Sequence, residues 1–149
     1  ELFRRAEDIT TKPVRLYEAG NGTQNSNEPK TDTMIKKELL LGDEAIAWGA
    51  LNAGLSGVYA YPGTPSTEIT EFIQMHPLTR ERGIHCNWSA NEKTALEAAL
   101  GMSFVGKRAL VCMKHVGMNV CADAFVNSAM TGANGGLVVV AADDPSMHS

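Results

Sequence analysis

Short runs of strand-forming residues alternate with longer segments of helical periodicity over most of this chain, and this alternation limits the possible folds more than any other feature. The strand-like runs lie at residues 57–61, 84–88, 109–113 and 137–142. Helices are predicted at residues 43–54, from residue 65 onward, at 92–105 and at 119–130. Strands separated by helices are typical of repeated βαβ units. We therefore predict an α/β fold with a mostly parallel sheet and helices on both faces.

Residues 1–36 differ in composition from the rest of the chain. Their middle part, residues 11–33, is rich in Thr, Asn, Gly, Pro, Lys and Glu and offers little apolar surface to bury. We predict that residues 1–36 form a poorly ordered leader or linker and that residues 37–149 form the globular domain. The sequence lacks an initial Met and stops directly after a strand-like run, so we expect a domain that is truncated at its C-terminus.

The charge balance argues against two classes of partner. The formal net charge is -4 with acidic and basic residues interspersed, so neither nucleic acid nor an anionic membrane is an expected partner. The longest apolar stretch, residues 137–142, is far shorter than the roughly 20 residues of a membrane-spanning helix. Residues 1–20 lack the apolar core of a secretory signal, so we expect a cytoplasmic location.

The three cysteines, Cys86, Cys112 and Cys121, lack the C-x-x-C spacing of iron–sulfur and zinc sites. Their odd number also argues against a disulfide framework, so we expect buried, reduced thiols. Asp143 and Asp144 could bind a metal together, but adjacent carboxylates after a strand are more typical of turns. No metal ligand is therefore assigned.

The loops after the strands are the expected place for chemistry, because ligands of open parallel sheets bind beyond the carboxyl ends of the strands. These loops are residues 61–66, 88–92, 113–119 and 142–148, and all are polar or rich in Gly and Pro. In the first loop, Thr64 is predicted to cap a helix that has Pro65 in its first position. Neither G-x-G-x-x-G nor a P-loop motif is present, which argues against a nucleotide-binding module.

Glu92 is the sharpest candidate for a functional residue, and its spacing allows two interpretations. Residues 89–92 fit a capping box, in which Glu92 bonds back to the N–H of Ser89. The alternative is a functional carboxyl at the start of a helix. In the next loop, Lys114 and His115 could offer a charge or a titrating proton. Lone residues of this kind are more often solvated or bonded to the backbone.

Four loop motifs carry a resemblance to a known family. They are YPGTPSTE at residues 61–68, WSANEK at 88–93, MKHVGMN at 113–119 and ADDPSMHS at 142–149. In their order and spacing they resemble the alpha subunits of indolepyruvate ferredoxin oxidoreductase, over residues 39–149. The resemblance implies that this region is the pyrimidine-binding (PYR) domain of an enzyme that uses thiamine diphosphate.

The same resemblance implies roles for particular residues. Glu92 matches the catalytic glutamate, which hydrogen-bonds N1′ of the cofactor from a largely dry cleft and favours its imino form. The implied cofactor-binding residues beside it are Pro62, Gly63 and Thr64. The implied substrate contacts are Lys114, His115 and Asn119.

The resemblance also implies a reaction and a set of partners. The reaction is the oxidative decarboxylation of indole-3-pyruvate or another arylpyruvate to an acyl-CoA, with coenzyme A as acceptor and ferredoxin as electron carrier. Mg²⁺ and 4Fe–4S clusters are expected in other parts of the enzyme. The expected protein partners are the remaining domains of the same subunit and a beta subunit, so this chain is not expected to be active alone.

Two alternatives stay open from the sequence. The first is a subunit of a pyruvate or 2-oxoglutarate ferredoxin oxidoreductase. The second is a non-catalytic PYR-like assembly module, for which a non-acidic residue at position 92 would be expected.

Overall fold

The structure is a computed structural model that describes residues 38–145. The predicted leader, residues 1–36, and the last four residues of the fourth motif lie outside the described residues.

Four parallel strands form one sheet in the order β2-β1-β3-β4. Their bounds are β1 Gly57–Ala60, β2 His85–Trp88, β3 Ala109–Lys114 and β4 Leu137–Ala142. In register, Gly57 of β1 lies opposite His85 on one side and Ala109 on the other, and Ala109 lies opposite Leu137. The predicted parallel α/β sheet is confirmed.

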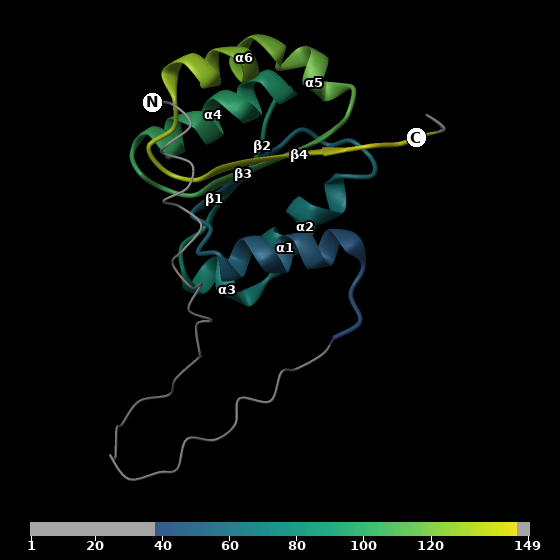
Figure 1. Ribbon diagram of the computed structural model, residues 1–149. Helices are drawn as coiled ribbons and strands as arrows, with labels where there is room; N and C mark the ends of the chain where they lie inside the picture. The colour runs from purple at the N-terminus through teal and green to yellow at the C-terminus, as the bar shows by residue number, and fades with distance from the viewer. Residues whose placement is uncertain (1–37, 146–149) are drawn as a thin grey trace, which may run out of the picture. The chain divides into compact units, whose positions relative to one another are not determined.

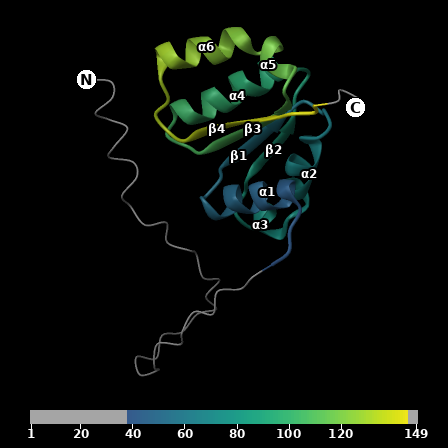
Figure 2. The ribbon, with the colours of Figure 1, turned by 45° about the vertical axis from the view of Figure 1, so that its right-hand side comes forward.

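Within residues 38–145, six helices cover the sheet. They are α1 Gly42–Asn52, α2 Thr67–Met75, α3 Pro77–Glu81, α4 Glu92–Phe104, α5 Gly117–Val120 and α6 Ala122–Thr131. Figure 1 shows α1, α2 and α3 on one face of the sheet and α4, α5 and α6 on the other. Figure 2 shows the same two layers after a rotation of the view. The predicted helices on both faces are therefore present.

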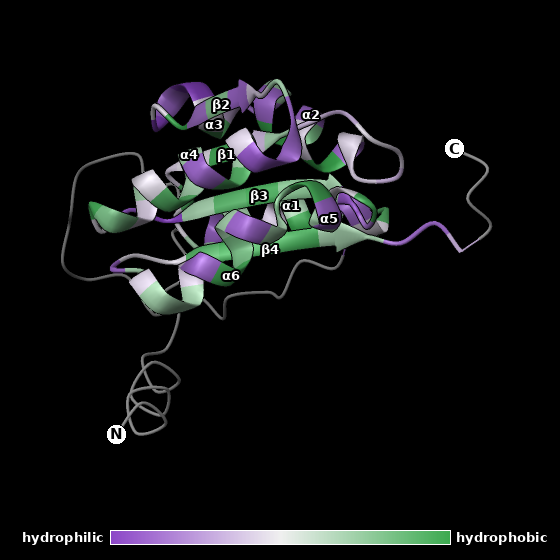
Figure 3. Cartoon of the chain, turned by 90° about the horizontal axis from the view of Figure 1, so that it is seen from above, coloured by the Kyte–Doolittle hydropathy of each residue, from purple (hydrophilic) through white to green (hydrophobic). Residues whose placement is uncertain are grey.

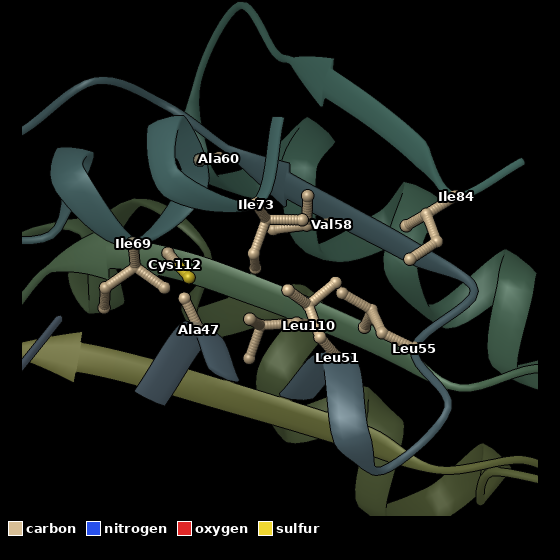
Figure 4. Packing of buried hydrophobic residues seen from close by; sticks show 10 residues of the cluster. All are labelled: Ala47, Leu51, Leu55, Val58, Ala60, Ile69, Ile73, Ile84, Leu110 and Cys112. Atoms are coloured by element: carbon tan, nitrogen blue, oxygen red, sulfur yellow. The ribbon is translucent and has the colours of Figure 1, made fainter. Parts of the chain in front are cut away.

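Each face of the sheet has its own hydrophobic core, because alternate residues of β1 and β3 point to opposite sides. The core under α1 and α2 consists of Ala47, Leu51, Leu55, Val58, Ala60, Ile69, Ile73, Ile84, Leu110 and Cys112, and Figure 4 shows these side chains gathered between the helices and the strands. The core under α4 and α6 consists of Tyr59, Ala95, Leu96, Ala99, Leu100, Ala109, Val111, Met113, Cys121 and Ala124. Figure 3 shows β3 and β4 hydrophobic over most of their length, as expected for strands between two helix layers.

The two edge strands, β2 and β4, depart from the expectation that all strands are buried: no residue of β4 is fully buried, and Val138 is 57% exposed. In β2, His85 and Asn87 are exposed, whereas their register partners Gly57 and Tyr59 are buried. The reason is that α4 starts after β2 but packs over β1 and β3. One face of β2 therefore remains uncovered by the helices that the structure describes.

Two helix predictions need correction, and one helix was missed. The helix predicted at residues 119–130 is divided into α5 and α6 at the buried Cys121. The short helix α3 was not predicted. Thr64 does not cap α2, since the N-cap is Ser66. The turn before α2 is held instead by Gly63, whose N–H donates to Thr67 Oγ1 at 3.0 Å and whose carbonyl accepts from Ser66 Oγ at 2.7 Å.

Candidate functional site

The four predicted loops meet at the carboxyl end of the sheet. The backbone N–H of Ser89, after β2, donates to the carbonyl of Ala60 at the end of β1, at 2.7 Å. The N–H of His115, after β3, donates to the carbonyl of Ala142 at the end of β4, at 2.9 Å. These two backbone bonds join the loops in pairs, those after β1 and β2 and those after β3 and β4, at the same end of the sheet.

Glu92 stands in the first position of α4, and its side chain belongs to the buried residues with 9% relative exposure. The capping box of α4 uses other residues: Thr94 N–H donates to Asn91 Oδ1 at 2.9 Å, and Asn91 N–H donates to Thr94 Oγ1 at 3.3 Å. Ser89 N–H is already bonded to Ala60. The capping-box interpretation of Glu92 is therefore wrong, because the helix start is satisfied without it.

The Glu92 carboxyl accepts no hydrogen bond from any residue in the range 38–145. Among residues 38–145, the fully buried side-chain polar atoms that lack a partner are Thr70 Oγ1 and His115 Nδ1, so the Glu92 carboxyl is not one of them. A carboxyl without a protein partner, on a side chain that is otherwise largely buried, is available to a ligand that carries a donor. In chemical terms, this carboxyl can accept a hydrogen bond from a bound group or exchange a proton with it.

Gly117 forms the wall beside this carboxyl. A Cβ atom at this position would lie 2.5 Å from Glu92 Cγ, 2.7 Å from Oε1 and 2.9 Å from Cδ. The first turn of α5 therefore packs directly against the glutamate side chain. From the sequence, Gly117 is recognisable only as part of a loop motif, and its contact with Glu92 is not predicted.

Lys114 and Asp144 form an ion pair across the ends of β3 and β4. Lys114 Nζ lies 3.3 Å from Asp144 Oδ2, and the two side chains are 11% and 15% exposed. Asp144 was predicted as a turn residue, so this pairing was also missed. In the sequence, the two residues follow strands that are consecutive along the chain. Such residues become neighbours when the two strands pair side by side.

His115 and Asn119 differ in how they are placed. His115 is half-buried, and its Nδ1 atom is buried without a hydrogen-bond partner among the described residues. Asn119 is exposed in α5, where its backbone N–H donates to the Val116 carbonyl at 3.1 Å. Of the two, His115 is the one with an unsatisfied polar atom.

The loop after β1 lies against the end of β3. A Cβ atom at Gly63 would lie 3.2 Å from Lys114 Cβ, so the turn passes close to that strand end. Pro62 and Thr64, on either side of this glycine, are exposed. The structure thus brings the predicted cofactor loop next to the predicted substrate loop.

The three cysteines are free thiols, as expected, although Cys86 is only half-buried while Cys112 and Cys121 are buried. Desolvation raises the pKa of Cys112 to about 12, so this thiol stays protonated and unreactive at neutral pH. No group of three or more His, Cys, Asp or Glu side chains suited to a metal ion occurs within residues 38–145. Within the same range, no helix is both long and apolar enough to cross a membrane.

The chain is similar in sequence to several curated proteins. It is 50% identical over 125 residues to the indolepyruvate oxidoreductase subunit IorA of Archaeoglobus fulgidus, which covers 83% of this chain. It is 50% identical over 114 residues to IorA of Pyrococcus horikoshii. A weaker match is the 2-oxoglutarate synthase subunit KorA of Methanothermobacter thermautotrophicus, at 33% identity over 98 residues.

These relatives are much longer than this chain, which spans 20% and 17% of the two IorA proteins. No family model matches the chain. Among solved structures, it resembles the 2-oxoglutarate:ferredoxin oxidoreductase from Magnetococcus marinus, with a TM-score of 0.61 and 21% identity over 70% of this chain and 18% of that one. This structural likeness supports the fold.

Proposed function

We propose a function from one premise: over its matched residues, this chain belongs to the family of the indolepyruvate oxidoreductase subunit IorA. The proposed reaction is the oxidative decarboxylation of indole-3-pyruvate or another arylpyruvate to an acyl-CoA, with the electrons passed to ferredoxin. This chain contributes the pyrimidine-binding part of a thiamine diphosphate site. The observation that carries the proposal is the largely buried Glu92 side chain, whose carboxyl has no hydrogen-bond partner among residues 38–145.

Glu92 fits the thiamine pyrimidine in two respects. Its side chain is largely buried and its carboxyl has no hydrogen-bond partner among residues 38–145, so the carboxyl is available to a ring nitrogen that shares or carries a proton. Glu92 also stands at the start of α4. The Asn91–Thr94 capping box stabilises this helix start, so the glutamate side chain is not needed for it. The side chain is thus held by the fold and can be used by a ligand.

In the proposed mechanism, Glu92 holds a proton between its carboxyl and N1′ of the pyrimidine ring. When bound, thiamine diphosphate supplies the carbanion chemistry of the decarboxylation. The contribution of Glu92 is to favour the ring form that this chemistry needs, by general acid–base exchange at one atom. The turn at Pro62, Gly63 and Thr64 lines the same end of the sheet and is proposed to contact the cofactor.

For the substrate, the structure favours His115 over Lys114. Lys114 is already paired with Asp144, whereas Nδ1 of His115 is buried and unpartnered within the described part of the chain. We therefore assign the carboxylate or carbonyl of the arylpyruvate to His115, and give Lys114 the task of holding the ends of β3 and β4 together. Asn119 remains a proposed substrate contact.

Other components of the proposal lie outside this chain. Mg²⁺, 4Fe–4S clusters, the beta subunit and the sites for ferredoxin and coenzyme A belong to the rest of the proposed enzyme. A cytoplasmic location remains a prediction from the sequence.

A 2-oxoglutarate enzyme is the second candidate, and the KorA relative and the Magnetococcus marinus structure favour it. The identity to IorA proteins is higher, at 43–50% for six of them against 33% for KorA. The arylpyruvate reaction is therefore preferred. An inactive PYR-like module is disfavoured by the acidic residue at position 92.

The test is Glu92→Gln in the complete enzyme, assayed with saturating thiamine diphosphate and indole-3-pyruvate. The amide keeps the shape of the side chain but cannot exchange the proton, so we expect turnover to fall about 100-fold or more. Glu97→Gln is the matched control, because Glu97 lies on the same helix but is exposed and only 3.9 Å from Lys93 in a surface ion pair. Turnover of Glu92→Gln within a few-fold of the control would remove Glu92 from the mechanism.

A further inference from the structure

The close approach of Gly117 to Glu92 has no explanation in the backbone conformation of the glycine. Positive φ angles occur at Gly54, Gly83, Gly106 and Gly132 among the described residues, and not at Gly117. Alanine would also be the better helix former in the first turn of α5. The property that glycine alone supplies here is space, since any Cβ would overlap the glutamate side chain.

The first turn of α5, which contains Gly117, is held on the same face of the sheet as α4 by contacts with β3 and β4. Two residues before α5, His115 donates its backbone N–H to the carbonyl of Ala142 on β4. The residue after α5, Cys121, is fully buried, and its Sγ lies 3.6 Å from Met113 Sδ on β3. The first turn of α5 is thus anchored at both ends and cannot easily yield to a larger side chain.

The position of the Glu92 carboxyl therefore depends on packing. It has no hydrogen bond from residues 38–145 to orient it, and a Cβ at position 117 would overlap three of its side-chain atoms. Buried side chains are held in one rotamer by such contacts. A change of one methyl group in this wall should move the carboxyl while leaving the two helices in place.

We propose that Gly117 is a positioning residue for Glu92: because position 117 has no side chain, the glutamate carboxyl can pack against the first turn of α5. This inference rests on the proposed function, because it gives Gly117 a role through the carboxyl that the cofactor uses. A misplacement of about 1 Å at a reacting group can lower a rate about 100-fold. We therefore expect Gly117→Ala to lower the rate of the reaction far more than the stability of the fold.

The first experiment compares Gly117→Ala with the parent in the complete enzyme. We expect the rate of C2 proton exchange of bound thiamine diphosphate, measured by nuclear magnetic resonance, to fall at least about tenfold, and turnover to fall with it. Gly101→Ala is the control, because a Cβ at this exposed position of α4 meets nothing within 4 Å. Exchange and turnover of Gly117→Ala equal to those of the control would overturn the proposal.

A second measurement follows the contact itself and does not depend on activity. Amide hydrogen exchange of the peptides that cover α5 and the start of α4 is compared in four proteins: the parent, Gly117→Ala, Glu92→Ala and the double variant. We expect Gly117→Ala to speed exchange when Glu92 is present and to have no effect when position 92 is alanine, because the overlapping atoms are then gone. An equal effect in both backgrounds would overturn the proposal, since the cost would not come from Glu92.

The two proposals fail in different ways. If Glu92→Gln and Gly117→Ala both leave turnover unchanged, while hydrogen exchange shows the coupling, the packing is real and the proposed function of Glu92 is wrong. If Glu92→Gln abolishes turnover and Gly117→Ala does not, Glu92 keeps its function and Gly117 loses its positioning role.

Discussion

The two ends of the parallel sheet differ in how their polar groups are satisfied. At the amino end, the N–H groups of Ser56 and Gly57 both donate to the Arg108 carbonyl, and Ser103 and Gly135 exchange two hydrogen bonds of 2.7 and 2.9 Å. At the carboxyl end, Glu92 and His115 each keep a polar atom without a partner in the described part of the chain. The fold closes one end of the sheet with its own backbone and leaves acceptors available at the other.

A pair of glycines shows the same contrast. Gly135, at the amino end, faces the backbone of its neighbours, and a Cβ there would overlap the Lys107 carbonyl oxygen and lie 2.7 Å from Lys107 N. Gly117, at the carboxyl end, faces the side chain of Glu92. Both positions exclude a methyl group, but the first serves the fold alone and the second serves a candidate functional group.

The largest effect on stability is expected for Gly135→Ala. The obstructing atoms are backbone, which cannot move aside, so we expect a loss of about 3 kcal/mol or more in the free energy of unfolding. Urea unfolding of the 149-residue chain, followed by circular dichroism, measures it. Gly136→Ala is the control, because its Cβ would lie 3.4 Å from Arg108 Cγ, an ordinary contact. Equal losses for the two variants would show that the amino end is less rigid than argued.

An intermediate effect is expected for Asp144→Asn at the carboxyl end. The amide leaves the Lys114 ammonium, whose side chain is 11% exposed, without its charged partner, so we expect a loss of about 1–3 kcal/mol in stability. The same urea titration applies. Adding Lys114→Met should recover part of the loss, because the remaining charge is then removed. If the double variant were as unstable as the sum of its single changes, the ion pair would not couple the two strand ends.

The smallest effect is a gain. Gly101 lies in the interior of α4, is exposed and would place a Cβ in open space, so Gly101→Ala should stabilise the chain by about 0.5–1 kcal/mol. The shift of the urea midpoint to higher concentration, at an unchanged slope, measures this gain. A loss of stability instead would mean that Gly101 too is constrained by packing, and the contrast with Gly117 would disappear.

The strands were predicted closely from the sequence. The run at residues 137–142 coincides with β4, and the run at 109–113 is one residue shorter than β3. Such runs are bounded by Gly, Pro or charged residues, and they are local features that adjacent residues define. Local patterns were less informative where tertiary contacts decide, as in the division of the last helix at Cys121 and in the absence of a cover over one face of β2.

For the candidate site, the sequence by itself determined the fold class, the four loops that share one end of the sheet, and Glu92 as the residue to examine. It could not decide between a capping glutamate and an unpaired one. That decision depended on which polar atoms find partners after folding, because the partners come from distant parts of the chain. Lys114 meets Asp144 across 30 residues, and Glu92 meets Gly117 across a whole strand. Contacts of this kind arise only when parallel strands align their ends, which no local pattern encodes.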